Sequence, residues 1–282
     1  MTPQFIAEVS SNHHQDLHRC LTFIDEAARI GCDAVKFQLF RINQLFAQEV
    51  LNQSETHRAR KAWELDPKLI PALAQRCRER QIQFSCTPFY LEAVRLLQPY
   101  VDFFKIASYE LLWRDLLTAC RDTGKPVVLS TGMANLEEVR QAAALFPRDG
   151  LTLLHCSSAY PTAPQNANLA AIETLQRVTG CATGWSDHTR NPAVIQRAIH
   201  RWGASVIEFH MDLDGTGAEY QAGHCWLPHE MEAVIRDVRT AWTADGHGRK
   251  EPNEEELPDR MWRADPSDGL RPLKSIRHGL VL

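Results

Sequence analysis

Short apolar runs recur along the whole chain, and the segments between them space their apolar residues as helices do. Unbroken apolar runs of this length are typical of strands that are covered on both faces. The predicted strands span residues 5–9, 34–39, 83–86, 103–106, 127–130, 151–155, 183–186 and 206–210. Polar residues gather at the ends of these runs, so the chemistry of the chain is expected at strand ends.

The segments between the strands carry the signals with which helices start and stop. Residues 17–30 form an apolar stripe that ends at a glycine, a natural C-cap. Asn135, Asn168 and Asn191 stand where N-caps are expected, and Pro228 opens the last helix. Eight strands that alternate with helices predict a closed (β/α)8 TIM barrel. An open doubly wound sheet would usually carry a glycine-rich fingerprint after its first strand, but here that text is SSNHHQDL.

The predicted barrel, a catalytic domain, occupies residues 1–243, and the polar residues 244–282 predict a partly ordered C-terminal tail. The net charge of −4 offers no basic field for nucleic acid. No apolar run approaches the ~20 residues of a transmembrane helix, and no secretory signal is visible. The eight cysteines are scattered singly, which favours buried free thiols in a reducing cytoplasm over zinc binding or disulfides.

Two lysines interrupt apolar strands at equivalent positions. Lys36 and Lys105 must be paired or must face a polar cavity, because an isolated buried ammonium is costly. A buried salt bridge would explain either lysine alone, but the two together favour the binding of a phosphate or carboxylate. Four hydroxyl side chains at strand ends would add neutral donors to the same anion: Thr87, Ser108, Ser130 and Ser186.

Two histidines end the last two predicted strands. His188 and His210 fit hydrogen-bonded core residues when each is taken alone. Neighbouring strand ends can, however, bring two imidazoles close enough to share a divalent metal ion. Asp187 or Glu208 would then orient one of the rings from behind.

These motifs together resemble the sialic acid synthase family, the phosphoenolpyruvate-dependent synthases of nonulosonic acids. The resemblance runs from about residue 5 to residue 239. It is carried by IAEVSSNHHQD, GCDAVKFQLF, SCTPF, FKIASYELLWRDLL, TGKPVVLSTGMANLEEV, LLHCSSAYPT, GWSDHT and GASVIEFHMDLD. The resemblance implies a barrel enzyme that condenses phosphoenolpyruvate with an open-chain aldose, typically N-acetylmannosamine, and releases phosphate. It also implies a divalent cation, Mn²⁺ or Mg²⁺, and a homodimer.

The resemblance also implies roles for individual residues. Lys36 and Lys105 would hold phosphoenolpyruvate with the four hydroxyls, and His188 and His210 would ligate the metal. Glu8 or Glu110 would serve proton transfer, and the sequence does not choose between them. The residues expected on the sugar side are Glu8, Gln38, Glu110, Tyr160 and Glu219.

The acceptor side of the chain departs from the family pattern. The chain ends too soon for the antifreeze-like domain that usually follows the barrel, and the loop 211–227 differs in length and content. Ser158 stands where the family commonly has an asparagine that faces the sugar. We therefore expect a metal-dependent condensation with an acceptor other than N-acetylmannosamine. The alternatives are a metal-dependent hydrolase on the same barrel and a non-catalytic protein that binds a sugar phosphate.

Overall fold

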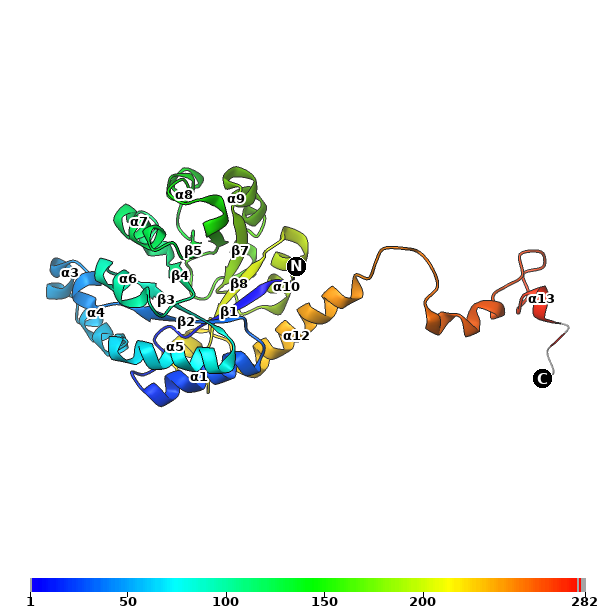
Figure 1. Ribbon diagram of the computed structural model, residues 1–282, viewed down its shortest axis with the longest axis horizontal. Coiled ribbons are helices and arrows are strands. Elements are labelled where there is room, and N and C mark those ends of the chain that lie inside the picture. The colour runs from blue at the N-terminus through cyan, green and yellow to red at the C-terminus, as the bar shows by residue number, and fades with distance from the viewer. Residues whose placement is uncertain (1, 278, 280–282) are drawn as a thin grey trace. The chain divides into compact units, whose positions relative to one another are not determined.

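Eight parallel strands close into a barrel in the order in which they occur in the chain, with helices around the outside (Figure 1). The structure is a computed structural model that describes residues 2–277 and 279. The strands are β1 Gln4–Glu8, β2 Ala34–Leu39, β3 Gln83–Pro88, β4 Phe103–Ile106, β5 Val127–Ser130, β6 Leu151–His155, β7 Ala182–Asp187 and β8 Val206–His210. The predicted TIM barrel is confirmed. Strands β2, β4, β5, β6 and β8 have the predicted bounds, β1 lies one residue earlier, and β3 and β7 are two residues longer.

Longer helices follow most strands and cover the barrel. They are α1 Leu17–Arg29, α5 Ile70–Arg80, α6 Leu91–Leu97, α7 Arg114–Asp122, α8 Leu136–Ala143, α9 Ala171–Thr179, α10 Pro192–Trp202 and α12 Pro228–Ala244. Asn135 and Asn191 cap α8 and α10 as predicted, since each side chain accepts a backbone N–H of the first turn. The cap predicted at Asn168 is wrong. This residue has a left-handed φ of 44°, which asparagine tolerates, and a turn separates it from the start of α9.

Two loops of the barrel contain additional α-helices that the apolar pattern did not predict. The connection after β2 holds α2 Ile42–Leu45, α3 Gln48–Gln53, α4 Glu55–Ala59 and the 3-10 helix η1 Arg60–Trp63. The connection after β8 holds α11 Ala218–Ala222. Both loops follow the carboxyl ends of strands, where barrel enzymes build their sites.

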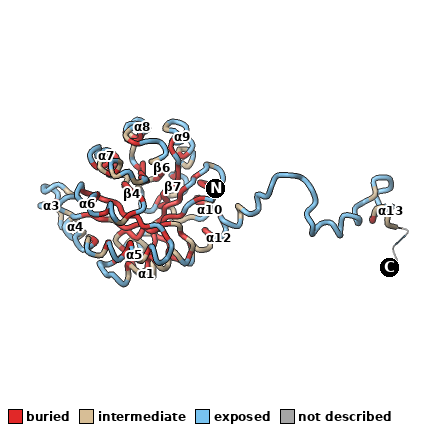
Figure 2. The backbone as a smooth tube through the Cα atoms, in the orientation of Figure 1, coloured by how far each residue is buried: buried red, intermediate tan, exposed pale blue. Residues whose placement is uncertain are grey.

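The interior of the barrel is layered because side chains alternate along each strand. A buried apolar cluster crosses the barrel, and its members are Ile6, Ala34, Phe103, Val128, Leu154 and Val206. Two positions further along the same strands come residues that line a pocket: Glu8, Lys36, Lys105, Ser130, Cys156 and Glu208. Gly184 on β7 leaves room for the apolar cluster, since a Cβ there would overlap the Val206 carbonyl oxygen. The pocket residues therefore lie one layer above a buried apolar layer, and Figure 2 shows the barrel strands as buried.

The contacts divide the chain into one unit that ends at Thr240 and another that begins at Ala241. The second unit contains the short helices η6 Glu254–Glu256, η7 Pro258–Trp262 and α13 Lys274–Arg277. Most of its described residues are exposed. Its local order comes from polar contacts, such as the backbone N–H of Lys274, which donates to Asp265 Oδ2 at 2.8 Å.

Two further observations bear on the chain as a whole. All eight cysteines are buried and free of disulfides, as predicted. Among the described residues, no helix combines the length and the apolar character that crossing a membrane requires.

Candidate active site

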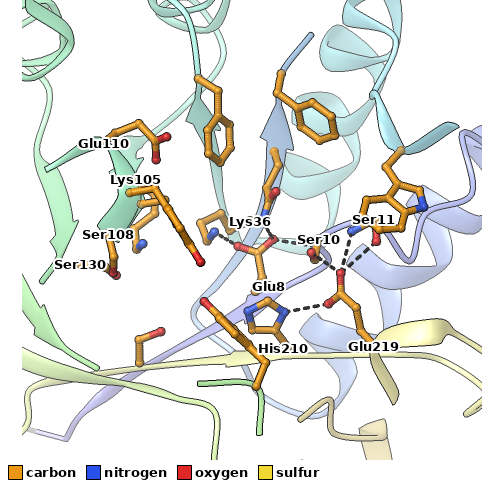
Figure 3. Close-up of a pocket in the computed structure, with 18 of the residues that line it drawn as sticks. Glu8, Ser10, Ser11, Lys36, Lys105, Ser108, Glu110, Ser130, His210 and Glu219 are labelled. Carbon is orange, nitrogen blue, oxygen red and sulfur yellow. Dashed lines mark hydrogen bonds and ion pairs between the residues drawn. The ribbon is translucent and has the colours of Figure 1, made fainter. Parts of the chain in front are cut away.

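A pocket of about 660 Å³ opens at the carboxyl ends of the barrel strands (Figure 3). All the site residues predicted from the sequence line it, with the exception of Thr87. Thr87 is buried on β3 and accepts a hydrogen bond from Lys36 Nζ at 3.3 Å, so it contacts the site through that lysine. The predicted residues that line the pocket are Glu8, Lys36, Gln38, Lys105, Ser108, Glu110, Ser130, Tyr160, Ser186, His188, His210 and Glu219.

The two predicted lysines are buried and share a carboxylate. Lys36 Nζ forms a close ion pair with Glu8 and lies 3.8 Å from Glu208 Oε2. Lys105 Nζ lies 3.6 Å from Glu208 Oε1, which also accepts the Ser186 hydroxyl at 2.9 Å. The lysines are therefore both salt-bridged and open to the pocket, which combines the two interpretations that the sequence allowed. The bridging position of Glu208 was not predicted, although it lies two residues before His210 and hence on the same face of β8.

Burial and charge act in opposite directions on these groups. Burial alone would raise the pKa of Glu208, but the charges of Lys105 and then Lys36 hold it well below its usual value. Burial lowers the pKa of Lys36 to about 8, and the charge of Glu208 opposes that shift. Glu208 is therefore ionised at neutral pH. An anion that enters the pocket must compete with carboxylates for the lysine charges.

Two buried polar atoms on the β4 and β5 side of the pocket, Ser130 Oγ and Glu110 Oε2, have no hydrogen-bond partner in the described part of the chain. Within the same residues, Lys105 Nζ makes one hydrogen bond, to the Ile106 carbonyl at 3.2 Å. Buried polar atoms in native proteins are nearly always paired, so unpaired ones that line a cavity point to a ligand that pairs them. This side of the pocket combines the Lys105 cation with an unpaired hydroxyl group, that of Ser130, and both can donate to an anion.

Glu110 and Glu8 differ in how firmly their carboxylates are held. Glu8 accepts the Ser10 N–H at 2.6 Å and pairs with Lys36. Glu110 is 8% exposed, and burial raises its pKa to about 7, with Lys105 opposing the shift. Glu110 can therefore exchange a proton near neutral pH, whereas the Glu8 carboxyl group is held by the Ser10 N–H and by Lys36.

The two predicted histidines lie side by side. Their ring centres are 5.4 Å apart. His188 Nδ1 lies 2.6 Å from the Ser157 carbonyl oxygen, which can only accept, so Nδ1 carries the proton and Nε2 keeps its lone pair. Burial and then His210 lower the pKa of His188 to about 3, which keeps the ring neutral at pH 7. A neutral imidazole with a free nitrogen is a metal ligand, so these residues fit a divalent cation.

The loop after β8 is fixed onto the barrel by charged contacts. Arg19 binds Asp212 at 2.9 Å and Asp214 at 2.8 Å. Glu219 on α11 accepts the Ser11 hydroxyl at 2.9 Å and lies 2.9 Å from His210 Nδ1 (Figure 3). The loop therefore brings a carboxylate to the histidine side of the pocket.

A wall that the sequence did not reveal closes the pocket on the side of the α2 to η1 connection. Phe46, His57, Arg60 and Trp63 line it. The Arg60 guanidinium lies 5.5 Å from the Phe46 ring centre and 5.4 Å from the Trp63 ring centre. Its Nε is buried and finds no hydrogen-bond partner within residues 2–277 and 279. The segment SETHRARKAW carried the only available signal, a mixture of basic and aromatic residues far from any strand end.

Buried charges and imidazoles that open into one pocket at the strand ends of a barrel are characteristic of an enzyme. The chain belongs to the NeuB family, which matches residues 23–250. N,N'-diacetyllegionaminic acid synthase of Legionella pneumophila is 34% identical over 92% of this chain and 78% of its own. Pseudaminic acid synthase of Campylobacter jejuni is 28% identical over 98% and 83%. A crystal structure of N-acetylneuraminic acid synthetase from Leptospira borgpetersenii has a TM-score of 0.79 at 31% identity, over 92% of this chain and 90% of that one. The predicted family and the predicted synthase class of enzyme are confirmed.

The environment of Glu110 predicts a measurable titration. Its carboxyl group should be half protonated near pH 7, and Lys105→Met should move the midpoint higher, because the lysine charge favours the carboxylate. The pH dependence of the side-chain carboxyl ¹³C shifts would measure this, with Glu110→Gln to assign the signal. Glu137 on the surface serves as the control. Its hydrogen bonds, first to Gln141, keep its pKa below the ordinary value. An ordinary pKa for Glu110 would remove it as a proton carrier.

Proposed function

We propose that the protein joins phosphoenolpyruvate to the aldehyde carbon of an aldose and releases phosphate, which yields a 2-keto-3-deoxy acid. The observation that carries the proposal is the division of one pocket into two sides (Figure 3). Lys105, Ser108 and Ser130 lie on one side, and His210 lies on the other, next to His188. An anionic donor and a carbonyl acceptor can therefore meet between a cationic side and an imidazole side.

Lys105 is the residue best prepared to receive the anion. Lys36 is closely paired with Glu8, whereas the Lys105 ammonium has a single hydrogen bond and a carboxylate at 3.6 Å. The phosphate or carboxylate of phosphoenolpyruvate would complete the hydrogen bonds of Lys105 and of the Ser130 hydroxyl. A preorganised cation in a site with little water stabilises the negative charge that develops on the leaving phosphate.

A divalent cation, Mn²⁺ or Mg²⁺, belongs to this proposal, with His188 and His210 as its predicted ligands. When bound, such a cation supplies Lewis acidity toward the carbonyl oxygen of the acceptor. The Ser157 carbonyl holds the His188 ring in the orientation and tautomer that leave Nε2 available. This backbone contact is the kind of supporting interaction that metal-ligating histidines usually have.

The proposed reaction forms one carbon–carbon bond and breaks the bond between carbon 2 and the bridging oxygen of phosphoenolpyruvate. Carbon 3 of the enol attacks the aldehyde carbon, the carbonyl oxygen takes a proton and becomes a hydroxyl, and water adds at carbon 2. The tetrahedral carbon 2 then breaks its bond to the bridging oxygen, which leaves with phosphate, and a keto group remains. Glu110 has the pKa to move a proton in these steps, either from the attacking water or to the new hydroxyl.

The acceptor is expected to lie against the wall of Phe46, Arg60 and Trp63. Aromatic faces suit the apolar face of a sugar, and the free Nε–H of Arg60 would donate to an acyl oxygen or an anionic group. The relatives are named for three different acids, so their names leave the acceptor of this chain open. We expect the acceptor to be a sugar other than N-acetylmannosamine. We also expect the protein to act as a homodimer and to reside in the cytoplasm.

The purified protein should release phosphate from phosphoenolpyruvate only when an aldose and Mn²⁺ are both present. A panel of aldoses, with and without phosphate or N-acyl groups, would identify the acceptor. Phosphate release without any aldose would indicate a hydrolase. The absence of phosphate release with every aldose would indicate a binding protein. Either result contradicts the proposal. Turnover of N-acetylmannosamine at ~10⁴ M⁻¹s⁻¹ or above would contradict the predicted acceptor alone.

The Lys105→Met variant should bind phosphoenolpyruvate roughly ten- to a hundredfold more weakly by calorimetry, because a charged hydrogen bond contributes about 1.5–3 kcal/mol. Lys125→Met is the matched control. Lys125 lies outside the pocket and donates to the Val101 carbonyl at 2.6 Å. Circular dichroism would establish that both variants are folded. Equal affinity of Lys105→Met and the unaltered protein would exclude this lysine as the anion site.

A further inference from the structure

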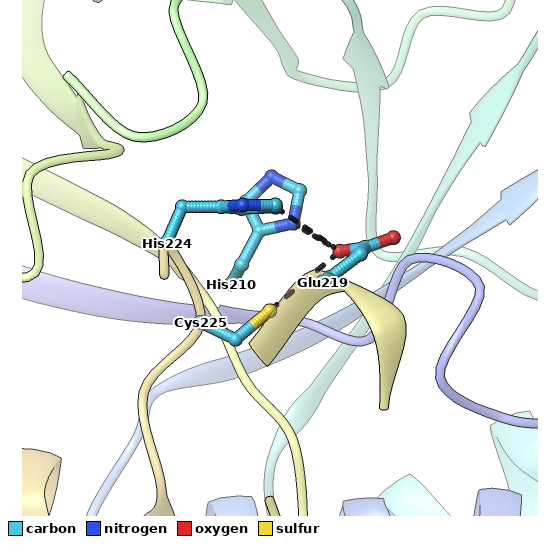
Figure 4. Close-up of side chains that lie close together, drawn as sticks. All are labelled: His210, Glu219, His224 and Cys225. Carbon is cyan, nitrogen blue, oxygen red and sulfur yellow. Dashed lines mark hydrogen bonds and ion pairs between the residues drawn. The ribbon is translucent and has the colours of Figure 1, made fainter. Parts of the chain in front are cut away.

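Four side chains of β8 and the loop after it converge on one point at the edge of the pocket (Figure 4). Their donor atoms surround one oxygen, Glu219 Oε2. His210 Nδ1 lies 2.9 Å from this oxygen, His224 Nε2 3.5 Å and Cys225 Sγ 3.6 Å. All four donor atoms lie within 4.8 Å of one another. Two nitrogens, one oxygen and one sulfur therefore meet within the space that a metal ion would occupy.

The three distances from Glu219 Oε2 are close to the donor–donor distances of a coordinated metal ion, and all pairs of donor atoms lie within 4.8 Å. With metal–nitrogen bonds of ~2.0–2.1 Å and metal–sulfur bonds of ~2.3 Å, the edges of a tetrahedral site measure roughly 3.3–3.6 Å. The distances from Glu219 Oε2 to His224 and Cys225 fall in or at the edge of this range. The shorter contact to His210 is an ordinary hydrogen bond in which Nδ1 donates to the carboxylate. Ligation through Nδ1 would place this proton on Nε2 and lengthen the contact by a few tenths of an ångström.

The backbone holds the two loop residues in place. Met211 and Trp226 form a β-bridge beside β8, and the Trp226 N–H donates to the His210 carbonyl at 2.8 Å. The Trp226 indole N–H donates to Asp187 Oδ2 at 3.1 Å. These bonds fix the segment that carries His224 and Cys225 against the strand that carries His210. Rigid support of this kind is what a metal site needs.

The two loop residues are buried and face the same carboxylate. His224 is 5% exposed, and its Nδ1 is buried without a hydrogen-bond partner among the described residues. Cys225 is fully buried, and its sulfur accepts a hydrogen bond from the Asn12 side-chain amide and donates one to Glu219, at 3.6 Å each. A role in packing alone would explain a buried cysteine, but it would not explain a second histidine directed at the same carboxylate.

We infer that Glu219, His224 and Cys225 join His210 as ligands of the one cation assigned above, with Cys225 as a thiolate ligand. Imidazole and thiolate donors favour Zn²⁺, Co²⁺ or Fe²⁺ over Mg²⁺, which prefers oxygen donors. Ligation replaces the S–H bond of Cys225 by a metal–sulfur bond and releases one proton to solvent. The use of the ion in catalysis rests on the proposed function, but its binding does not.

Cobalt substitution tests the site directly. After treatment with a chelator, the full-length protein should take up one Co²⁺ per chain. It should then show a near-ultraviolet thiolate-to-cobalt charge-transfer band that a large excess of Mg²⁺ does not remove. Cys225→Ser should abolish the band, and the control Cys120→Ser, in a buried cysteine on α7 outside the pocket, should keep it. A cobalt-loaded protein without this band would overturn the inference.

Competition with a chromogenic chelator adds an independent readout. His224→Gln should weaken Co²⁺ binding by more than roughly tenfold, since even supporting residues of metal ligands are typically worth 10–100-fold. The inference would also be overturned if His224→Gln and Cys225→Ser both bound Co²⁺ as tightly as the unaltered protein does. Circular dichroism spectra that match the spectrum of the unaltered protein would establish that both variants are folded. If His188→Gln and His210→Gln lost the metal in that case, the cation of the proposed function would be bound by these two histidines and not by His224 and Cys225.

Discussion

The buried charge arrangement in which Glu208 joins Lys36 to Lys105 is the interaction on which the rest of the site depends. Two ammonium groups inside a barrel would be prohibitively costly without counter-charges. Glu208 and Glu8 supply these, and the Ser186 hydroxyl satisfies a further lone pair. The apolar layer beneath, which includes Ile6 and Val206, excludes water from below. Both lysines are thus held at the pocket by carboxylates, and Lys105 has fewer partners than Lys36 among the described residues.

This arrangement explains how an anion could bind in a pocket that also contains carboxylates. The carboxylates keep the lysines charged and positioned while the pocket is empty, and a substrate anion then replaces part of their interaction. Glu110 responds to the same balance, because Lys105 favours its ionised form and burial favours its neutral form. A substrate anion bound to Lys105 would weaken the stabilisation of ionised Glu110 by this lysine. The pKa of Glu110 would therefore rise when the substrate binds. Substrate binding and proton supply would therefore be coupled through one lysine.

The fold and the polar half of the site could be predicted from the sequence because they depend on short, regular spacings of apolar and polar residues along strands and helices. Alternation along strands placed Lys36, Lys105 and His210 on the inner face, and the strand bounds followed from unbroken apolar runs. The wall around Arg60 and Trp63 could not be predicted, since it lies on short helices of a long loop whose position depends on tertiary packing. Glu208 was predicted only as a residue that could orient a histidine ring, and its role between the two lysines required the positions of β2 and β4. His224 and Cys225 were hidden because their approach to His210 depends on a single β-bridge.

The central claim is that phosphate leaves from carbon 2 of phosphoenolpyruvate during carbon–carbon bond formation. Phosphoenolpyruvate labelled with ¹⁸O at the bridging position tests it most directly, with the released phosphate analysed by mass spectrometry. The account predicts that the phosphate retains the labelled bridging oxygen and that an oxygen from water appears in the keto acid. Phosphate that has lost the label and gained an oxygen from water would show cleavage of the phosphorus–oxygen bond, as in simple hydrolysis, and would contradict the account.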